Sequence, residues 1–451
     1  MIMRFLPDEA ISDDTEDFLG FSDFVNLLKL SIYNTQTPFV YGVLGDWGVG
    51  KTSILQLLKN RLINDLDSGR KLFIPIWFNA WKYENETNII YPLLYAIKQD
   101  YIKRFKSIEM KDEFWRDFTK VATASIAVLT DLGLRVATKR LAGEAIKLDD
   151  ITKQVQATES LSSELESILS EWADQVNQIN QAFAKLLDAY SNALMELYKD
   201  KVCSKDEIVF VFIIDDLDRC LPETTISILE GIKNYLSVER CVYILGLNPN
   251  IIYQGIRIKY KGLEVDGREY LEKILNYSFY VPEPQIQKIP EFVLSRFNSL
   301  IINESVREKY KSMFIEFGEI LEKCRFNNPR KIKRVLNRYL FFLNSYEKEI
   351  YKYYNSNIVR LIILAEYFPG LFQLFLKSDN ITTSIKSELM KIGQLDFKLE
   401  EFEKRFGISI VSVYPQLSKM NELFNLNLNT TGDKLSITKN AQNVFCITRL
   451  T

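Results

Sequence analysis

The chain has 451 residues, of which 47% are hydrophobic and 26% charged, and this suits a folded protein of about two or three domains. Its 57 lysines and arginines nearly balance its 59 aspartates and glutamates, so a net charge of −2 provides no general attraction to nucleic acid. Histidine is absent, which excludes Ser-His-Asp, Cys-His and H-E-x-x-H catalysis and leaves carboxylates, lysines and bound metal as candidate catalysts.

The cysteines and the N-terminal residues indicate the cellular compartment in which the protein is expected. The five cysteines are scattered and show no C-x-x-C spacing, so we expect neither a disulfide framework nor a zinc site. The chain begins Met1-Ile2-Met3-Arg4 and lacks the apolar core of a secretory signal. We therefore expect a protein of the reducing cytoplasm.

A glycine-rich stretch follows an apolar run at residues 39–44 and precedes a helix-like segment at residues 53–62. It fits the pattern G-x-x-x-x-G-K-[ST], and its strand–loop–helix context favours a phosphate-binding loop over an ordinary glycine turn. Glycines let backbone N–H groups face a phosphate, and the helix adds its positive end. Lys51 would reach the β- and γ-phosphates, and the Thr52 hydroxyl would ligate Mg²⁺. The predicted cofactor-binding residues here are Gly45, Asp46, Trp47, Gly48, Val49, Gly50, Lys51, Thr52 and Ser53.

A helix and a second strand are expected on either side of this loop. Apolar side chains recur at helical spacing over residues 22–33, and this helix either packs on the sheet or holds the nucleotide base. Residues 71–78 predict a buried strand that ends in aromatic and polar residues, where ligands bind in open α/β sheets. Trp77 and Trp81 suit that role or the core, and we favour the core.

Residues 108–205 interrupt the α/β rhythm, and we predict a helical insertion there. Four charged residues interrupt its most apolar part, residues 121–143: Asp131, Arg135, Lys139 and Arg140. A bilayer crossing needs about 20 mostly apolar residues, so we expect no membrane span. From Leu161 to Leu197 apolar residues recur every three or four positions, as in a coiled coil. This seam indicates an intramolecular helical hairpin or a contact with another chain, and we favour the hairpin.

An apolar run at residues 208–214 predicts a central parallel strand covered on both faces. It ends in Asp215 and Asp216, which such a strand brings beside the phosphate loop. We expect Asp215 to hold Mg²⁺ through water, and Asp216 to orient or deprotonate the attacking water, with Asp218 as the next candidate base. A solvated acidic turn is the alternative, but the phosphate loop requires an acidic partner of this kind.

A helix at residues 222–236 and a further strand at residues 241–247 follow. That strand ends in Asn248, which either senses the γ-phosphate or caps the helix that Pro249 begins. The residues leave both roles open. No [NT]-K-x-D segment follows the strands, so we expect ATP rather than GTP.

Helical periodicity dominates residues 284–426, which predict a C-terminal helical domain. Within it, Asn328 and Pro329 begin a helix whose first turns are crowded with basic residues, although a helix N-terminus disfavours cations. Their anionic partner would be the γ-phosphate or nucleic acid, and an ordinary solvated basic face is the third possibility. We predict that Arg330 is a catalytic arginine that reaches the γ-phosphate. The tail, residues 427–451, is short and β-leaning.

These motifs in combination resemble the KAP family of P-loop ATPases, in the additional-strand class related to STAND and AAA-type switches. The resemblance spans most of residues 13–340 and rests on Asp17-Phe18-Leu19-Gly20, Gly45-Asp46-Trp47-Gly48-Val49-Gly50-Lys51-Thr52, Phe78-Asn79-Ala80-Trp81, Asp215-Asp216-Leu217-Asp218-Arg219, Tyr270-Leu271-Glu272-Lys273-Ile274 and Asn328-Pro329-Arg330-Lys331-Ile332-Lys333-Arg334. It implies that an insertion before the strand with the acidic end is common among members of the family. Many members place two membrane-spanning helices there, and many carry an acidic residue where this chain has Asn248.

The expected fold is an α/β P-loop NTPase with a parallel sheet core. The predicted parts are an ATPase core at residues 1–107 and 206–283, the insertion at 108–205, the helical domain at 284–426 and the tail at 427–451. Because bacterial members of the family are associated with phage exclusion, the resemblance implies a Mg²⁺-dependent ATPase switch in an anti-phage complex, with protein partners and a homo-oligomer. The alternatives are a non-hydrolysing ATP-gated scaffold and a nucleic-acid-stimulated motor; nucleic acid is a possible partner but not a required one.

Overall fold

The computed structural model describes residues 5–64, 71–84, 90–105, 159–199, 204–261, 265–301, 304–345 and 356–367, a few residues between 114 and 120, and residues 202 and 369. The chain forms two compact units. Ser22–Val281 make the first, the α/β unit, and Met1–Phe21 with Pro282–Thr451 make the second, the helical unit. The predicted boundary after residue 283 lies close to this division, whereas residues 1–21 group with the helical unit and not with the predicted core.

The α/β unit alternates strands and helices. In chain order it contains α1 (Ser22–Tyr33), β1 (Phe39–Leu44), α2 (Lys51–Asn64), β2 (Leu72–Asn79), η3 (Ala80–Tyr83), α3 (Ile90–Arg104), α6 (Glu159–Leu197), η4 (Lys205–Glu207), β3 (Ile208–Asp215), η5 (Leu217–Arg219), α7 (Pro222–Tyr235), β4 (Cys241–Leu247), α8 (Pro249–Lys259), α9 (Gly267–Ile274) and β5 (Tyr277–Tyr280). Strands β3 and β4 are buried at every residue, because each is a continuous apolar run covered on both faces.

The described strands form one parallel sheet in the order β2-β3-β4-β1-β5. Strand β4 therefore lies between β1, which leads into the phosphate loop, and β3, which ends in the acidic residues. The register keeps the carboxyl ends of the strands level, since Leu44 pairs with Leu247 and Asn79 pairs with Asp215. The predicted α/β fold with a parallel sheet core is confirmed.

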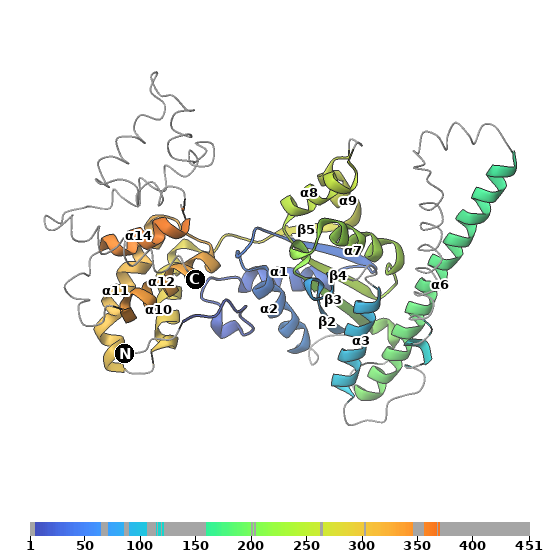
Figure 1. Ribbon diagram of the computed structural model, residues 1–451. Helices are drawn as coiled ribbons and strands as arrows, with labels where there is room; N and C mark the ends of the chain where they lie inside the picture. Colours follow the sequence, from blue (N-terminus) through green and yellow to red (C-terminus); the bar gives the residue numbers. More distant parts are fainter. Residues whose placement is uncertain are drawn as a thin grey trace, which may run out of the picture. The chain divides into compact units, whose positions relative to one another are not determined.

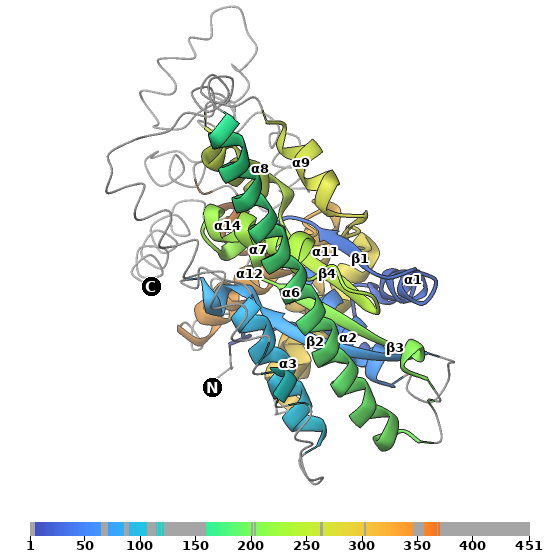
Figure 2. The same ribbon diagram turned by 90° about the vertical axis from the view of Figure 1, so that its right-hand side faces the viewer.

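Helices cover both faces of the sheet (Figures 1 and 2). On one face α2 contacts the strands, and α1 packs on α2. On the other face α3, α6 and α7 share an apolar core with the strands. The ring of Tyr190 in α6 lies over Phe210 of β3 with centroids 5.4 Å apart, and Phe212 stacks on Tyr243 at 5.0 Å. The alternating residues of each strand thus fill two separate apolar layers.

The predicted apolar seam forms one long helix, α6, which runs beside α3 (Figure 2). Between Ile179 and Leu194 most of its apolar side chains are buried in the sheet's covering layer, among them Phe183, Leu186 and Leu194. The partner of this half of the seam is therefore the α/β core itself. The apolar stretch at residues 121–143 lies outside the described residues. Of the helices that the structure describes, none combines the length and apolar content of a bilayer crossing.

The helical unit contains η1 (Asp14–Glu16), η6 (Ile286–Lys288), α10 (Ile289–Leu300), α11 (Glu304–Lys323), α12 (Pro329–Ser345) and α14 (Ser356–Tyr367). Stacked rings join its helices: Phe297 of α10 and Phe314 of α11 have centroids 3.8 Å apart. The N-terminal segment is fastened to α12, because Asn337 accepts a hydrogen bond from the Leu6 N–H at 2.7 Å and donates one to its carbonyl at 2.8 Å. The predicted β-leaning tail at 427–451 lies outside the described residues.

Candidate active site

The loop between β1 and α2 has the backbone that a phosphate cradle requires. Gly48 and Gly50 have φ angles of 80° and 110°, a region in which any other residue is strained. Helix α2 begins at Lys51, so its unpaired N-terminal N–H groups face the loop. The Trp47 side chain at the loop is 55% exposed, and Ser53 is half-buried in the first turn of α2. The predicted phosphate-binding residues thus form a loop that leads into the N-terminus of α2.

The ammonium of Lys51 is held over this loop by three oxygens, and the side chain is only 8% exposed. Its Nζ donates to the carbonyl oxygens of Gly45 at 2.8 Å and Asp46 at 3.1 Å. It also forms an ion pair with Asp218 Oδ2 at 3.0 Å. A phosphate in the loop would replace Asp218 as the counter-charge of Lys51, so the ion pair and phosphate binding compete.

Asp215, the last residue of β3, is 1% exposed. Its Oδ2 is buried and has no hydrogen-bond partner among the described residues. Burial raises the pKa of Asp215 to about 6, the charge of Asp216 adds to the shift, and a hydrogen bond with Thr52 opposes it. A divalent cation would restore the charged carboxylate, and a carboxylate beside a hydroxyl is an oxygen set that suits Mg²⁺. The residues present therefore fit the predicted metal site.

Asp216 has a left-handed backbone, with φ of 60°, and both of its carboxylate oxygens have partners. Oδ1 lies 2.8 Å from Nε of Arg219, whose guanidinium stands over the Trp81 ring at 5.2 Å. Oδ2 accepts a hydrogen bond from the Asn79 amide at 2.8 Å. The two partners fix the orientation of the predicted general base, and each oxygen keeps a lone pair that a water could use.

Asn248 caps a helix, one of the two roles that the sequence left open, and its role in sensing the γ-phosphate stays a prediction. Its Oδ1 accepts a hydrogen bond from the Asn250 N–H at 3.1 Å and so caps α8. Its Nδ2 donates to Asp46 Oδ1 in the phosphate loop at 3.3 Å. One amide thus caps a helix and contacts the loop at the end of the strand between β1 and β3.

The basic residues at the start of α12 have partners inside the helical unit. Arg330 Nε lies 2.6 Å from Asp8 Oδ2. Arg334 and Arg338 each form an ion pair with Glu366 at 3.0 Å. The anions that these helical cations require are thus present in the same unit. The predicted contact of Arg330 with the γ-phosphate stays a prediction.

Sequence reasoning did not single out Asn79 or Arg219 as partners of Asp216. Asn79 is 137 residues from Asp216 and reaches it only through the register of β2 with β3. The available signal was a polar residue that ends a strand, the same signal that identified Asn248. The prediction that Trp81 belongs to the core is wrong, because the chain turns into η3 at Ala80 and leaves Trp81 49% exposed.

Solved structures similar to this chain include two proteins from Aeropyrum pernix. The ORC2 protein, in ADPNP–ADP complexes, is 10% identical with a TM-score of 0.35, and the match covers 99% of this chain and 97% of that one. The ORC1 protein in complex with DNA is 12% identical with a TM-score of 0.34, and the match covers 98% and 96%.

A curated relative and a family model match on sequence. The Phage T7 exclusion protein of Escherichia coli (strain K12) is 22% identical over 344 residues, which are 74% of this chain and 43% of the relative. The chain therefore spans less than half of the relative's length. The model of the KAP family P-loop domain matches residues 21–345, which contain the phosphate loop, Asp215 and the start of α12. This chain belongs to the KAP family of P-loop NTPases.

Proposed function

We propose that the chain is a Mg²⁺-dependent ATPase that uses hydrolysis as a conformational switch. The observation that carries this proposal is the buried Oδ2 of Asp215, which has no hydrogen-bond partner among the described residues. Asp215 ends a strand that is separated by one strand from β1 and its phosphate loop, and its side chain is hydrogen-bonded with Thr52. Asp215 and Thr52 would hold Mg²⁺, which neutralises phosphate charge when it is bound. Loop N–H groups and Lys51 would hold the phosphates of ATP.

The remaining acidic residues give the switch two states. Binding of ATP takes Lys51 from Asp218, because the phosphates offer more negative charge than one carboxylate. Asp216, which Asn79 and Arg219 hold in place, would then orient or deprotonate water through a remaining lone pair. Phosphoryl transfer relies on positioning and charge, which suits a chain without histidine.

The test is nucleotide binding and phosphate release by the full chain. Lys51→Ala should abolish Mg·ATP binding, and Asp215→Asn should remove the Mg²⁺ dependence of that binding. Lys233→Ala, which alters an exposed lysine of α7, is the matched control and should behave as wild type. If calorimetry finds that Lys51→Ala binds Mg·ATP as tightly as wild type, the site assignment is wrong.

We also propose that this switch acts in phage exclusion, within a complex of partner proteins or further copies of the chain. The name of the Escherichia coli relative supports this role, over the part of it that the chain spans. Cells that express the wild type should reduce plaque formation by a panel of phages that includes T7, whereas cells that express Lys51→Ala should not. Equal plaque counts for both would contradict the proposal.

An ATP-gated scaffold that does not hydrolyse is the second candidate. The two partners of Asp216 support it, because each occupies an acceptor site of the carboxylate and leaves fewer sites for an attacking water. Single-turnover measurements with excess protein separate the two functions. Bound ATP that stays uncleaved, together with phage exclusion, would favour the scaffold.

A further inference from the structure

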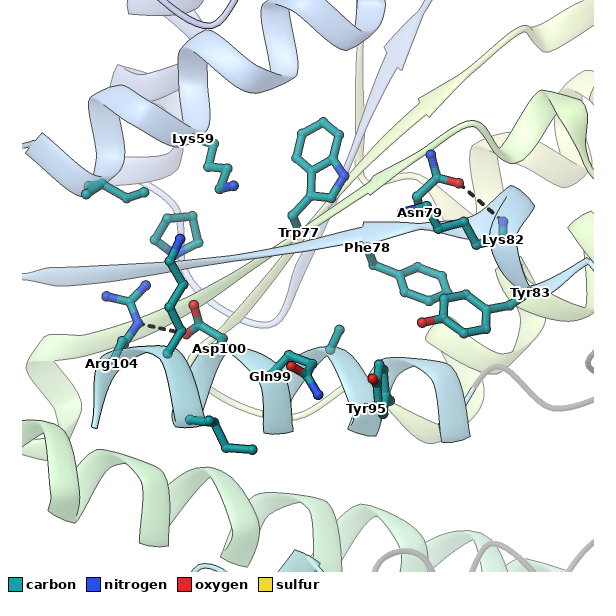
Figure 3. A pocket seen from close by; sticks show the side chains of 15 residues that line it. Lys59, Trp77, Phe78, Asn79, Lys82, Tyr83, Tyr95, Gln99, Asp100 and Arg104 are labelled. Atoms are coloured by element: carbon teal, nitrogen blue, oxygen red, sulfur yellow. Dashed lines mark hydrogen bonds and ion pairs between the residues drawn. The ribbon is translucent and has the colours of Figure 1, made fainter. Parts of the chain in front are cut away.

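A cavity of about 650 Å³ lies along β2, between α2, η3 and α3 (Figure 3). In the described sheet β2 is an end strand, so one of its sides pairs with no described strand. The volume falls within the range of small-molecule sites. None of the phosphate-loop residues 45–52 lines the cavity, while Asn79 lines it at one end. The cavity is therefore separate from the ATP site and adjacent to Asp216.

The lining of this cavity carries an excess of positive charge. Lys59, Lys82 and Lys103 line it, and none of them has an ion pair among the described residues. The carboxylate of Asp100 is already engaged by Arg104 Nε at 2.8 Å and by the Tyr190 hydroxyl at 2.6 Å. Burial lowers the pKa of Lys59, and the charge of Lys103 lowers it further. The fold therefore places Lys59 and Lys103 near each other, and the nearby carboxylate, Asp100, is shared with Arg104.

Aromatic rings and side-chain amides also line this cavity. Nζ of Lys59 stands 5.7 Å from the centroid of the Trp77 ring, and both side chains point into the same space (Figure 3). Tyr95 is 50% exposed and lies on the opposite side of β2, near Tyr83. The Gln99 amide lies beside them on α3. Lysines interleaved with aromatic rings are typical of sites that hold a phosphate and stack a base.

A peptide strand is the other ligand that an open sheet edge could accept. Pro75 lies in the middle of β2 and has no N–H to donate, which weakens strand addition. We propose that the cavity binds a nucleotide-class ligand, with its phosphate at Lys59 and Lys103 and its base on an aromatic ring. The ligand is a free dinucleotide or the end of a single nucleic-acid strand, which share this chemistry.

The experiment uses the full chain with its phosphate loop saturated by Mg²⁺ and a non-hydrolysable ATP analogue. Fluorescence anisotropy follows the binding of a labelled 5′-phosphorylated thymidine dinucleotide and of a longer oligothymidylate. Lys59→Glu should weaken both by about tenfold or more, because one charge-assisted contact becomes repulsive. Lys233→Glu makes the same charge change on an exposed face of α7 and should leave both affinities unchanged. Binding of the ATP analogue by Lys59→Glu confirms that the variant is folded.

The longer probe identifies the source of the ligand. Equal affinity for the two probes assigns the cavity to a free nucleotide, and much tighter binding of the oligothymidylate assigns it to a strand end. The proposal is overturned if neither probe binds, or if Lys59→Glu and Lys233→Glu bind the probes equally. Binding of a polyglutamate peptide in their place would overturn it in favour of an acidic partner.

Discussion

Substitutions of Asp216 and of its partner Asn79 are expected to change the rate of phosphate release in opposite directions. Asp216→Asn keeps the shape of the side chain but cannot accept a proton, so steady-state phosphate release should fall by about 10²-fold or more. Asn79→Ala removes one of the two restraints on the carboxylate and should raise basal turnover. Asn234→Ala, at an exposed position of α7, serves as the control. If Asn79→Ala loses turnover as Asp216→Asn does, Asn79 supports catalysis and does not restrain it.

Substitution of Arg330 is expected to change the affinity for ATP but not the affinity for ADP. Its pair with Asp8 is partly exposed, with side chains 34% and 52% accessible, and such surface pairs contribute only about 0–1 kcal/mol. Exchange of Asp8 for a γ-phosphate is therefore inexpensive in free energy. Arg330→Ala should weaken ATP binding by roughly 1.5–3 kcal/mol and spare ADP binding.

Asp8→Ala breaks the same ion pair and is the matched control for Arg330. It should leave the affinity for both nucleotides unchanged or slightly raise that for ATP. Calorimetric titrations of the two variants with Mg·ATP and Mg·ADP decide the matter. An equal loss of both nucleotides in Arg330→Ala would show a structural role, and loss of nucleic-acid binding would favour a motor.

At the scale of elements, Glu230 joins α7 to α8 and α9. It accepts hydrogen bonds from Lys259 Nζ at 2.7 and 2.8 Å, from the Tyr260 hydroxyl at 3.0 Å and from the Tyr270 hydroxyl at 2.6 Å. Burial by itself raises the pKa of Glu230, but these hydrogen bonds outweigh it and hold that pKa below the ordinary value of 4.5. The ionised group therefore stabilises the fold above pH 4.5, and this contribution is lost as pH falls through the lower pKa.

Chemical unfolding near neutrality and in acid tests this contribution. The wild type should lose about 1 kcal/mol more of its unfolding free energy on acidification than Glu230→Gln, whose amide does not titrate. Identical losses in the two proteins would mean that the three helices are held together without the charge of Glu230.

Helix α6 is predicted to be a structural part of the α/β unit. Phe183 is fully buried and its ring lies 6.2 Å from that of Phe212 in β3. Phe183→Ala should lower the unfolding free energy by about 3–5 kcal/mol, because it leaves a cavity in the layer that covers the sheet. Gln178→Ala, at an exposed position of the same helix, should change it by less than about 0.5 kcal/mol. Similar stability of both variants would show that α6 only rests on the sheet.

At the scale of the molecule, periodicity and local motifs predicted the elements better than their partners. Strands β1, β3 and β4 are apolar runs, and the phosphate loop and the acidic residues follow at the ends of β1 and β3. The sequence therefore predicted both the parallel sheet and the motifs at its edge. The hydrogen bond from Asn79 to Asp216 depends on the register of β2 with β3, which no local pattern encodes. The grouping of the first 21 residues with the helical unit rests on an irregular segment held by side chains such as Asn337, and irregular segments have no period to read.

The position of β1 in the sheet has a consequence for synthesis of the chain. In the described sheet this strand pairs with β4 and β5, and the earlier of them, β4, leaves the ribosome about 200 residues after it. At ordinary elongation rates β1 therefore waits on the order of ten to forty seconds for its first partner. During that time an apolar hexapeptide and the phosphate loop behind it have no strand on either side. The nascent chain thus has to be kept from associating through β1 until Cys241–Leu247 emerge and insert between the two halves of the nucleotide site.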